Sequence, residues 1–212
     1  MTHIDYTLYL VTDRSVMSAK SLEQAVEQAI QGGCTVVQLR EKYASSREFF
    51  ETAQRVKQIT DSYPIPLIIN DRTDICLAVN AAGIHIGQQD LPAKIVRSMV
   101  GPDKIIGVSA ATLSEAIQAE QDGADYLGVG AMFATSTKTN TRPVTIERLT
   151  QIKQAVQIPV VAIGGIQSSN VTTLTDTGID GIAVVSAILA QENITHAAEQ
   201  LKACFTGAGH EV

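Results

Sequence analysis

The chain has 212 residues, a formal net charge of −6 and 45% hydrophobic residues, which is typical of one compact domain with a substantial core. The acidic excess, without a basic stripe, argues against nucleic acid and anionic membranes as partners. The three cysteines are widely spaced and form no CxxC pair, so we interpret them as reduced thiols. Because the sequence shows neither a secretory signal nor an apolar run long enough to span a membrane, we expect a cytoplasmic protein.

Short apolar runs alternate with helical patterns along the chain. The predicted strands begin at Thr7, Thr35, Pro66, Gly83, Ile105, Tyr126, Pro159 and Gly181. The predicted helices between them include "SLEQAVEQAIQGG" with an N-cap at Ser21, "TLSEAIQAEQDG" with a capping box of Thr112 and Glu115, "SSNVTTLTDTG" and "SAILAQENITHAAEQLKACF". Eight strands in strict alternation with about eight helices predict an α/β fold, a single (β/α)8 TIM barrel domain over residues 1–212. An open doubly wound sheet is the alternative, although such sheets usually have fewer strands.

A barrel of this kind binds ligands at the C-terminal ends of its strands, and polar residues gather there in this sequence. They are Gln38, Arg40 and Lys42, Asn70 and Asp71, Asp90, Ser109, Thr135 to Lys138, and Ser186, while Gly164-Gly165 and Val185 stand beside them after the last two strands. Arg40 and Lys42 are two residues apart and would share one face of a continuing strand, where unpaired charge is costly. We therefore expect them to bind an anion that the substrate brings.

Two further groups indicate a phosphorylated ligand. Asp71 and Asp90 follow neighbouring strands and could share one Mg²⁺, which favours one or two carboxylates with water and phosphate oxygens. Each has a simpler interpretation, Asp71 as a helix N-cap and Asp90 as a loop residue. Gly164 and Gly165 follow the seventh strand, where barrels commonly bind phosphate through backbone amides, although glycines also simply permit tight turns.

Three other polar residues are left undecided by the sequence. His85 lies on the fourth strand without a Ser or Cys partner in a recognisable triad, which favours a packed or pocket-lining role over acid–base catalysis. Asp13 and Arg14 follow the first strand, where an ion pair or a cap is the commoner role.

The segments "QLREK", "IINDR", "HIGQQDLP", "GVSAAT", "TSTKT", "AIGGI" and "VVSAI" occur in an order and spacing that resembles the thiamine-phosphate synthase family, from about Leu8 to Ile188. The resemblance implies a (β/α)8 barrel that joins 4-amino-5-hydroxymethyl-2-methylpyrimidine diphosphate to hydroxyethylthiazole phosphate. The implied products are thiamine monophosphate and pyrophosphate, formed with Mg²⁺ by a dissociative substitution. The implied partners are therefore two small phosphorylated substrates, while a homo-oligomer is left open.

The resemblance also implies roles for individual positions. It places the pyrimidine diphosphate against Gln38, Leu39, Arg40, Glu41, Lys42, Asn70, Ser109 and Lys138, of which Arg40, Lys42, Ser109 and Lys138 would be catalytic. It places the thiazole phosphate against Thr135, Ser136, Thr137, Gly165, Val185 and Ser186, and Mg²⁺ on Asp71 and Asp90. The chain departs from the family pattern at Ala131 and Ala134, where the family usually has proline. The stiffness of this loop is therefore expected to differ from that of the usual family loop.

Two other functions are compatible with parts of this pattern. A thiazole tautomerase would bind the same thiazole phosphate but would not need the cations Arg40, Lys42 and Lys138 or the paired aspartates. A non-catalytic barrel that senses a phosphorylated ligand would not need residues for two substrates. One turnover assay that measures pyrophosphate, with both substrates and Mg²⁺ supplied, distinguishes both from a synthase.

Overall fold

Eight parallel strands pair in chain order, and β8 returns to pair with β1, which closes a barrel. The structure, a computed structural model, describes residues 4–135 and 142–207. The strands are β1 (Leu8–Val11), β2 (Val36–Leu39), β3 (Leu67–Asn70), β4 (Gly83–Ile86), β5 (Ile105–Ala110), β6 (Tyr126–Val129), β7 (Val160–Ile163) and β8 (Gly181–Val184). The predicted (β/α)8 barrel is confirmed, and the alternative open sheet is wrong.

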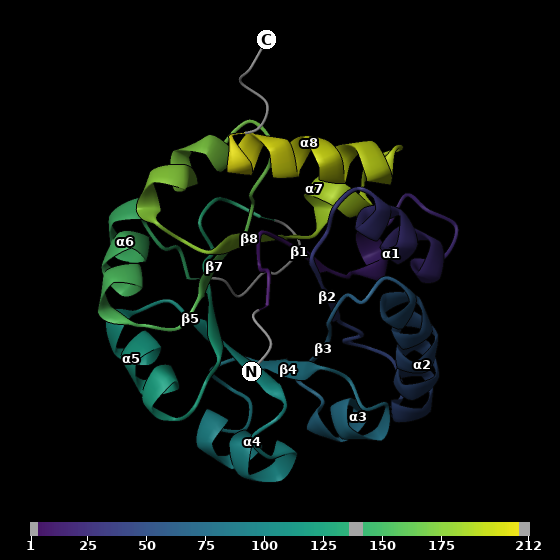
Figure 1. Ribbon diagram of the computed structural model, residues 1–212, viewed down its shortest axis with the longest axis horizontal. Helices are drawn as coiled ribbons and strands as arrows, with labels where there is room; N and C mark the ends of the chain where they lie inside the picture. Colours follow the sequence, from purple (N-terminus) through teal and green to yellow (C-terminus); the bar gives the residue numbers. More distant parts are fainter. Residues whose placement is uncertain (1–3, 136–141, 208–212) are drawn as a thin grey trace.

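Helices follow the strands and form a ring around them in Figure 1. They are α1 (Leu22–Gln31), α2 (Ser46–Ser62), α3 (Thr73–Ala78), α4 (Ala93–Val100), α5 (Leu113–Gln121), α6 (Ile146–Ala155), α7 (Ser186–Leu189) and α8 (Ile194–Thr206), with the 3₁₀ helices η1 (Arg14–Val16) and η2 (Val171–Thr177). Within the described ranges, no helix combines the length and the apolar character needed to cross a membrane.

Two predicted helix starts are confirmed, whereas the predicted helix "SAILAQENITHAAEQLKACF" is divided into α7 and α8, with the Asn193 side chain capping α8. The Ser21 side chain caps α1, and Thr112 and Glu115 form the expected capping box of α5. The segment after β7 differs from the prediction, because Val171–Thr177 forms a 3₁₀ helix that ends at Gly178 with a left-handed φ of 75°. Four of its seven residues are threonine, whose β-branched side chain lowers helix propensity and competes for backbone hydrogen bonds.

Side chains of each strand alternate between two cores. Leu8 and Leu10 pack outward against the helices, whereas Tyr9 and Val11 point into the barrel. The residues of this inner core are Tyr6, Tyr9, Val11, Val36, Ile68, Tyr126, Val161 and Ala183. Because these side chains fill the interior of the barrel, we expect a ligand to bind at the C-terminal mouth of the barrel.

Candidate active site

The C-terminal ends of the strands surround a cavity of about 1410 Å³. The structure brings most of the residues predicted from the sequence to its wall. They are Gln38, Arg40, Glu41, Lys42, Asn70, Asp71, Asp90, Ser109, Thr135, Gly165, Val185 and Ser186. Three residues predicted to bind the substrates, Ser136, Thr137 and Lys138, lie outside the described residues.

The end of β2 is more complex than its sequence pattern indicates. The strand stops at Leu39, so Arg40 and Lys42 belong to the following loop. Gln38 is buried in the barrel and donates from Nε2 to the Tyr9 hydroxyl at 2.9 Å. The Leu39 side chain is fully buried in the outer core and faces away from the mouth, which is the normal alternation of a strand. Lys42 is exposed and makes no ion pair among the described residues.

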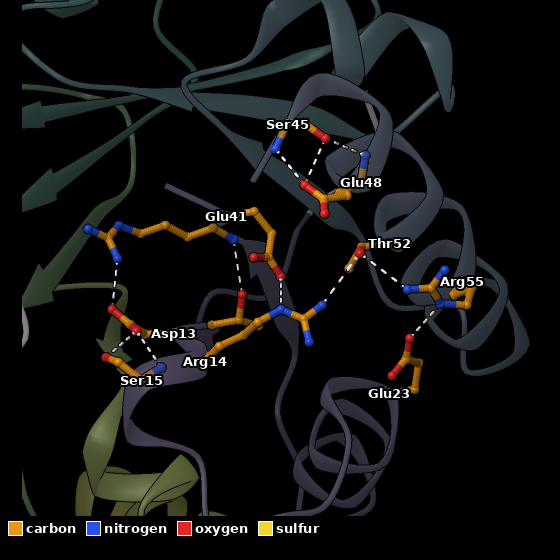
Figure 2. Close-up of polar contacts among 11 residues, drawn as sticks. Asp13, Arg14, Ser15, Glu23, Glu41, Ser45, Glu48, Thr52 and Arg55 are labelled. Atoms are coloured by element: carbon orange, nitrogen blue, oxygen red, sulfur yellow. Dashed lines mark hydrogen bonds and ion pairs between the residues drawn. The ribbon is translucent and has the colours of Figure 1, made fainter. Parts of the chain in front are cut away.

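The loops after β1 and β2 are joined by two ion pairs. Arg40 Nη1 lies 2.8 Å from Asp13 Oδ2, and Arg14 Nε lies 2.5 Å from Glu41 Oε1. Figure 2 shows Arg14 between Glu41 and Thr52, and Asp13 also accepting from Ser15. Asp13 and Arg14 therefore form ion pairs, and Asp13 also caps η1. These contacts hold the two loops together at the edge of the cavity.

Asp71 and Asp90 come from neighbouring loops on the opposite side of the mouth from β7 and β8. Asp71 adopts a positive φ of 62°, and its amide donates to the His85 carbonyl at 2.9 Å. The helix α3 instead has Arg72 at its N-cap, with no side-chain cap, so the interpretation of Asp71 as an N-cap is wrong. Asp90 Oδ2 accepts from the Gly87 amide at 2.7 Å, which orients its carboxylate at the cavity wall.

The residues that follow β7 and β8 line the cavity. Gly164 and Gly165 have φ of 102° and 66°, in the region that favours glycine. A Cβ on Gly165 would lie 2.5 Å from the Ala134 carbonyl oxygen, so the loop after β6 can approach only because this residue has no side chain. After β8, α7 begins directly at Ser186, where its first amides have no partner within the helix.

The loop after β6 is anchored at both ends. The Ala131 amide donates to the Arg142 carbonyl and the Val144 amide to the Ala131 carbonyl, each at 2.9 Å. Arg142 also forms a two-pronged ion pair with Glu115, at 2.7 and 2.9 Å. This guanidinium is the main cause that lowers the pKa of the Glu115 carboxyl. The helix α6 begins at Ile146 with Thr145 as its cap.

Sequence reasoning did not identify two tyrosines that support the site from below. Tyr9 and Tyr126 lie in apolar strand patterns, yet their hydroxyls are 2.7 Å apart inside the barrel. Tyr126 contacts His85 Nδ1 at 2.9 Å, and His85 Nε2 contacts Ser109 Oγ at 2.9 Å. Burial raises the pKa of both phenols. The available signal was that a tyrosine on an inward strand position needs a polar partner.

Comparisons with known proteins show what this chain is similar to. The family model described as thiamine monophosphate synthase matches residues 8–188. The thiamine-phosphate synthase of Ruminiclostridium cellulolyticum is 61% identical over 95% of this chain and 96% of its own, and that of Clostridium tetani is 58% identical over 96% and 97%. The solved structure of thiamine phosphate pyrophosphorylase from Pyrococcus furiosus has a TM-score of 0.89 at 38% identity, covering 97% of this chain and 98% of that one.

Proposed function

Because this chain belongs to the thiamine-phosphate synthase family, we propose that its barrel mouth joins 4-amino-5-hydroxymethyl-2-methylpyrimidine diphosphate to hydroxyethylthiazole phosphate. The family consists of transferases of thiamine biosynthesis. One observation carries the assignment of both substrates to this mouth, namely the continuous cavity of about 1410 Å³. Pockets for a single small ligand usually have about 300–1,000 Å³, so this one has room for two.

The diphosphate belongs on the side formed by the loops after β2 and β3. Arg40 and Lys42 supply positive charge there, and Asn70 offers an amide at the same wall. An arginine binds a phosphate through two parallel hydrogen bonds, whereas a lysine acts as a compact charge. Lys138, outside the described residues, is assigned to the same diphosphate by the family pattern. These cations stabilise the negative charge that grows on the departing pyrophosphate.

Asp71 and Asp90 are the residues that would hold Mg²⁺. Both line the cavity, and the hydrogen bond from the Gly87 amide leaves further lone pairs on the Asp90 carboxylate. Among the described residues, no group of three or more His, Cys, Asp and Glu side chains gathers to enclose a metal. That pattern suits Mg²⁺, which uses one or two carboxylates and completes its shell with water and phosphate. When bound, Mg²⁺ would neutralise the leaving diphosphate.

The thiazole phosphate belongs on the opposite side, near β7 and β8. Gly165 and Ser186 present backbone amides there without adding net charge, and Thr135 adds a hydroxyl from the loop after β6. The resemblance assigns Ser136, Thr137 and Val185 to the same phosphate. Holding the two phosphates at separate walls would bring the thiazole nitrogen in line with the pyrimidine methylene.

The chemistry needs no nucleophile from the protein. Loss of pyrophosphate leaves a pyrimidine methylene cation that the 4-amino group stabilises, and the thiazole nitrogen then attacks it. The chain must keep water away from this cation, and apolar side chains at the base of the cavity, Val11, Val161 and Ile163, would do so. We also propose the cytoplasm as the compartment, which is supported by the three free cysteines.

The test is a turnover assay with the purified chain. Both substrates and Mg²⁺ are supplied, and pyrophosphate and thiamine monophosphate are measured in parallel. Formation of both products in equal amounts supports the proposal, and each single-substrate control is expected to give neither. Release of pyrophosphate without thiamine monophosphate would refute it.

A further inference from the structure

A chain of hydrogen bonds crosses the interior of the barrel below the cavity. It joins Gln38, Tyr9, Tyr126, His85 and Ser109, which we call the interior chain, through four contacts of 2.7 to 2.9 Å. Its members come from β2, β1, β6, β4 and β5, so it connects strands that are far apart in the sequence. Gln38 and the two tyrosines are buried, whereas His85 and Ser109 line the cavity wall.

The barrel leaves room for the interior chain at two glycines. A Cβ on Gly107 would overlap the ring and the hydroxyl of Tyr126. A Cβ on Gly128 would lie 2.9 Å from Cε1 of His85, which is too close for carbon atoms. Both glycines have ordinary negative φ angles within strands, so backbone conformation does not require them there. Their role is to make space for these two polar rings.

Gln38, at one end of the interior chain, fixes the direction of its hydrogen bonds. Its Nε2 group can only donate, so the Tyr9 oxygen accepts there. The Tyr9 hydrogen is buried and needs an acceptor, and among the described residues the Tyr126 oxygen is the remaining hydrogen-bond partner of the Tyr9 hydroxyl. The Tyr126 hydrogen then points to His85 Nδ1. A neutral imidazole that accepts at Nδ1 carries its proton on Nε2, and this proton points to Ser109 Oγ. Within residues 4–135 and 142–207, the hydrogen of the Ser109 hydroxyl then has no acceptor in the protein.

We propose that the interior chain positions the Ser109 hydroxyl as a hydrogen-bond donor toward the cavity. In this arrangement Tyr9 and Tyr126 are positioning residues, since they act on the substrate only through His85 and Ser109. The substrate atom that meets Ser109 must then be an acceptor, such as an unprotonated ring nitrogen or an oxygen, and not an N–H group. The effect on turnover rests on the proposed function, whereas the direction of the interior chain does not.

The direct test is the tautomer of neutral His85, read by long-range ¹H–¹⁵N correlation on histidine-labelled protein at mildly alkaline pH. The resonances of His85 are identified by their loss in His85→Gln. We expect the proton on Nε2 in the parent, and a changed Nδ1 resonance in Tyr126→Phe, which removes the donor to Nδ1. A proton on Nδ1 in the parent would show that the interior chain runs in the opposite direction and would overturn the proposal.

The functional test is a double-mutant cycle between Tyr126→Phe and Ser109→Ala. Tyr126→Phe is expected to lower kcat/KM for the pyrimidine diphosphate about tenfold, but to cost little more once Ser109 is already alanine, because it acts through that residue. Additive losses would contradict the proposal.

The matched control for this cycle is Tyr6→Phe. Tyr6 packs on the Tyr126 ring with centroids 4.8 Å apart but takes no part in the interior chain, so its loss should change activity less than twofold. Thermal melts of all variants check that each one folds. The His85 spectrum is recorded without substrate, so it tests this inference even if the parent protein is inactive. An inactive parent would instead count against the proposed function.

Discussion

Asp13 Oδ2 accepts a hydrogen bond from Arg40 Nη1 at 2.8 Å, so a cation expected to bind the diphosphate already has a carboxylate partner. Both side chains are largely buried, with 18% of Arg40 and 14% of Asp13 exposed. If the diphosphate binds Arg40 as proposed, it must compete with Asp13 for this guanidinium or share its separate N–H groups. We therefore expect this ion pair to affect how tightly the substrate binds.

Replacing Asp13 with Asn removes this competing charge. Asn retains a carbonyl oxygen that can accept from Ser15 as Asp13 Oδ1 does, so η1 keeps its cap. We expect the KM of the pyrimidine diphosphate to fall about two- to fivefold, which corresponds to about 0.4–1 kcal/mol of competing ion-pair energy. Steady-state kinetics measure the change. A raised KM would mean that Asp13 orients Arg40 instead of competing with the substrate.

Arg40→Lys should have the opposite effect, because an ammonium cannot form the paired hydrogen bonds of a guanidinium. We expect kcat/KM for the pyrimidine diphosphate to fall at least tenfold, while the affinity for the thiazole phosphate changes little. Arg97→Lys is the matched control, since Arg97 pairs with Asp125 in a similarly buried contact and is not part of the cavity wall. Equal losses in the two variants would argue against a specific role for Arg40.

Asp71→Asn and Asp90→Asn should each depress activity, and excess Mg²⁺ should restore part of it. Each variant removes a negative charge from the proposed metal site, which weakens the binding of the cation. Activity is measured across a Mg²⁺ titration, with Asp74→Asn as control, because Asp74 pairs with Arg72 on the outer surface. Full activity of either variant in the presence of a chelator would rule out the shared metal site.

Lys138→Ala should slow pyrophosphate release about 10²–10³-fold, the usual cost of one preorganised donor in the transition state. Lys57→Ala is the control, since Lys57 pairs with Asp61 along α2. Calorimetry of each substrate separates the two phosphate sites. If Lys138→Ala mainly weakened the thiazole phosphate, this residue would belong to the other substrate.

Ala134→Pro restores the proline that is usual in the family to the loop after β6. Among the described residues, the amides of Met132 and Phe133 donate to β7 and to Gly164, whereas the Ala134 amide makes no hydrogen bond that a proline would remove. A compatible proline stabilises an ordered segment by about 0.4–1 kcal/mol. We therefore expect a two- to fivefold lower KM for the thiazole phosphate, with kcat unchanged or slightly lower.

The control for this loop is Ala134→Gly, which should raise the same KM, because glycine has more conformational freedom to lose. Steady-state kinetics of both variants are compared with the parent. A raised KM in Ala134→Pro would show that this loop uses a backbone conformation that proline cannot adopt.

The ion pair between Glu115 and Arg142 should make the stability of the fold depend on pH. Arg142 lowers the pKa of Glu115 in the folded state, so its contribution is complete above the unfolded pKa of about 4.3 and is lost as the pH falls through the lowered value. Arg142→Gln should therefore lower Tm at pH 7 but change it little near pH 2. Arg148→Gln on α6 is the control, and an equal loss at both pH values would exclude the ion pair as the cause.

Much of the site could be predicted because strand order places the polar ends of a parallel barrel at one mouth. Asn70, Asp90 and Ser109 line the cavity as expected, since each follows or ends an apolar strand. The pairing of Arg40 with Asp13 could not be predicted, because it depends on how two loops 27 residues apart bend toward each other. Leu39 was assigned to the substrate only through its family motif, and its side chain packs against the helices.

The alternation of strands and helices, the closed barrel and the family could be predicted from the amino-acid sequence, because hydrophobic periodicity and motif spacing can be read along the chain. Which polar groups meet inside the barrel depends on how the distant strands pack together. Tyr9 and Tyr126 are 117 residues apart, and each belongs to an apolar strand pattern, yet their hydroxyls share a hydrogen bond inside the barrel. That contact exists because neighbouring interior glycines leave space for the rings, and because a buried hydroxyl must find a partner once water is excluded.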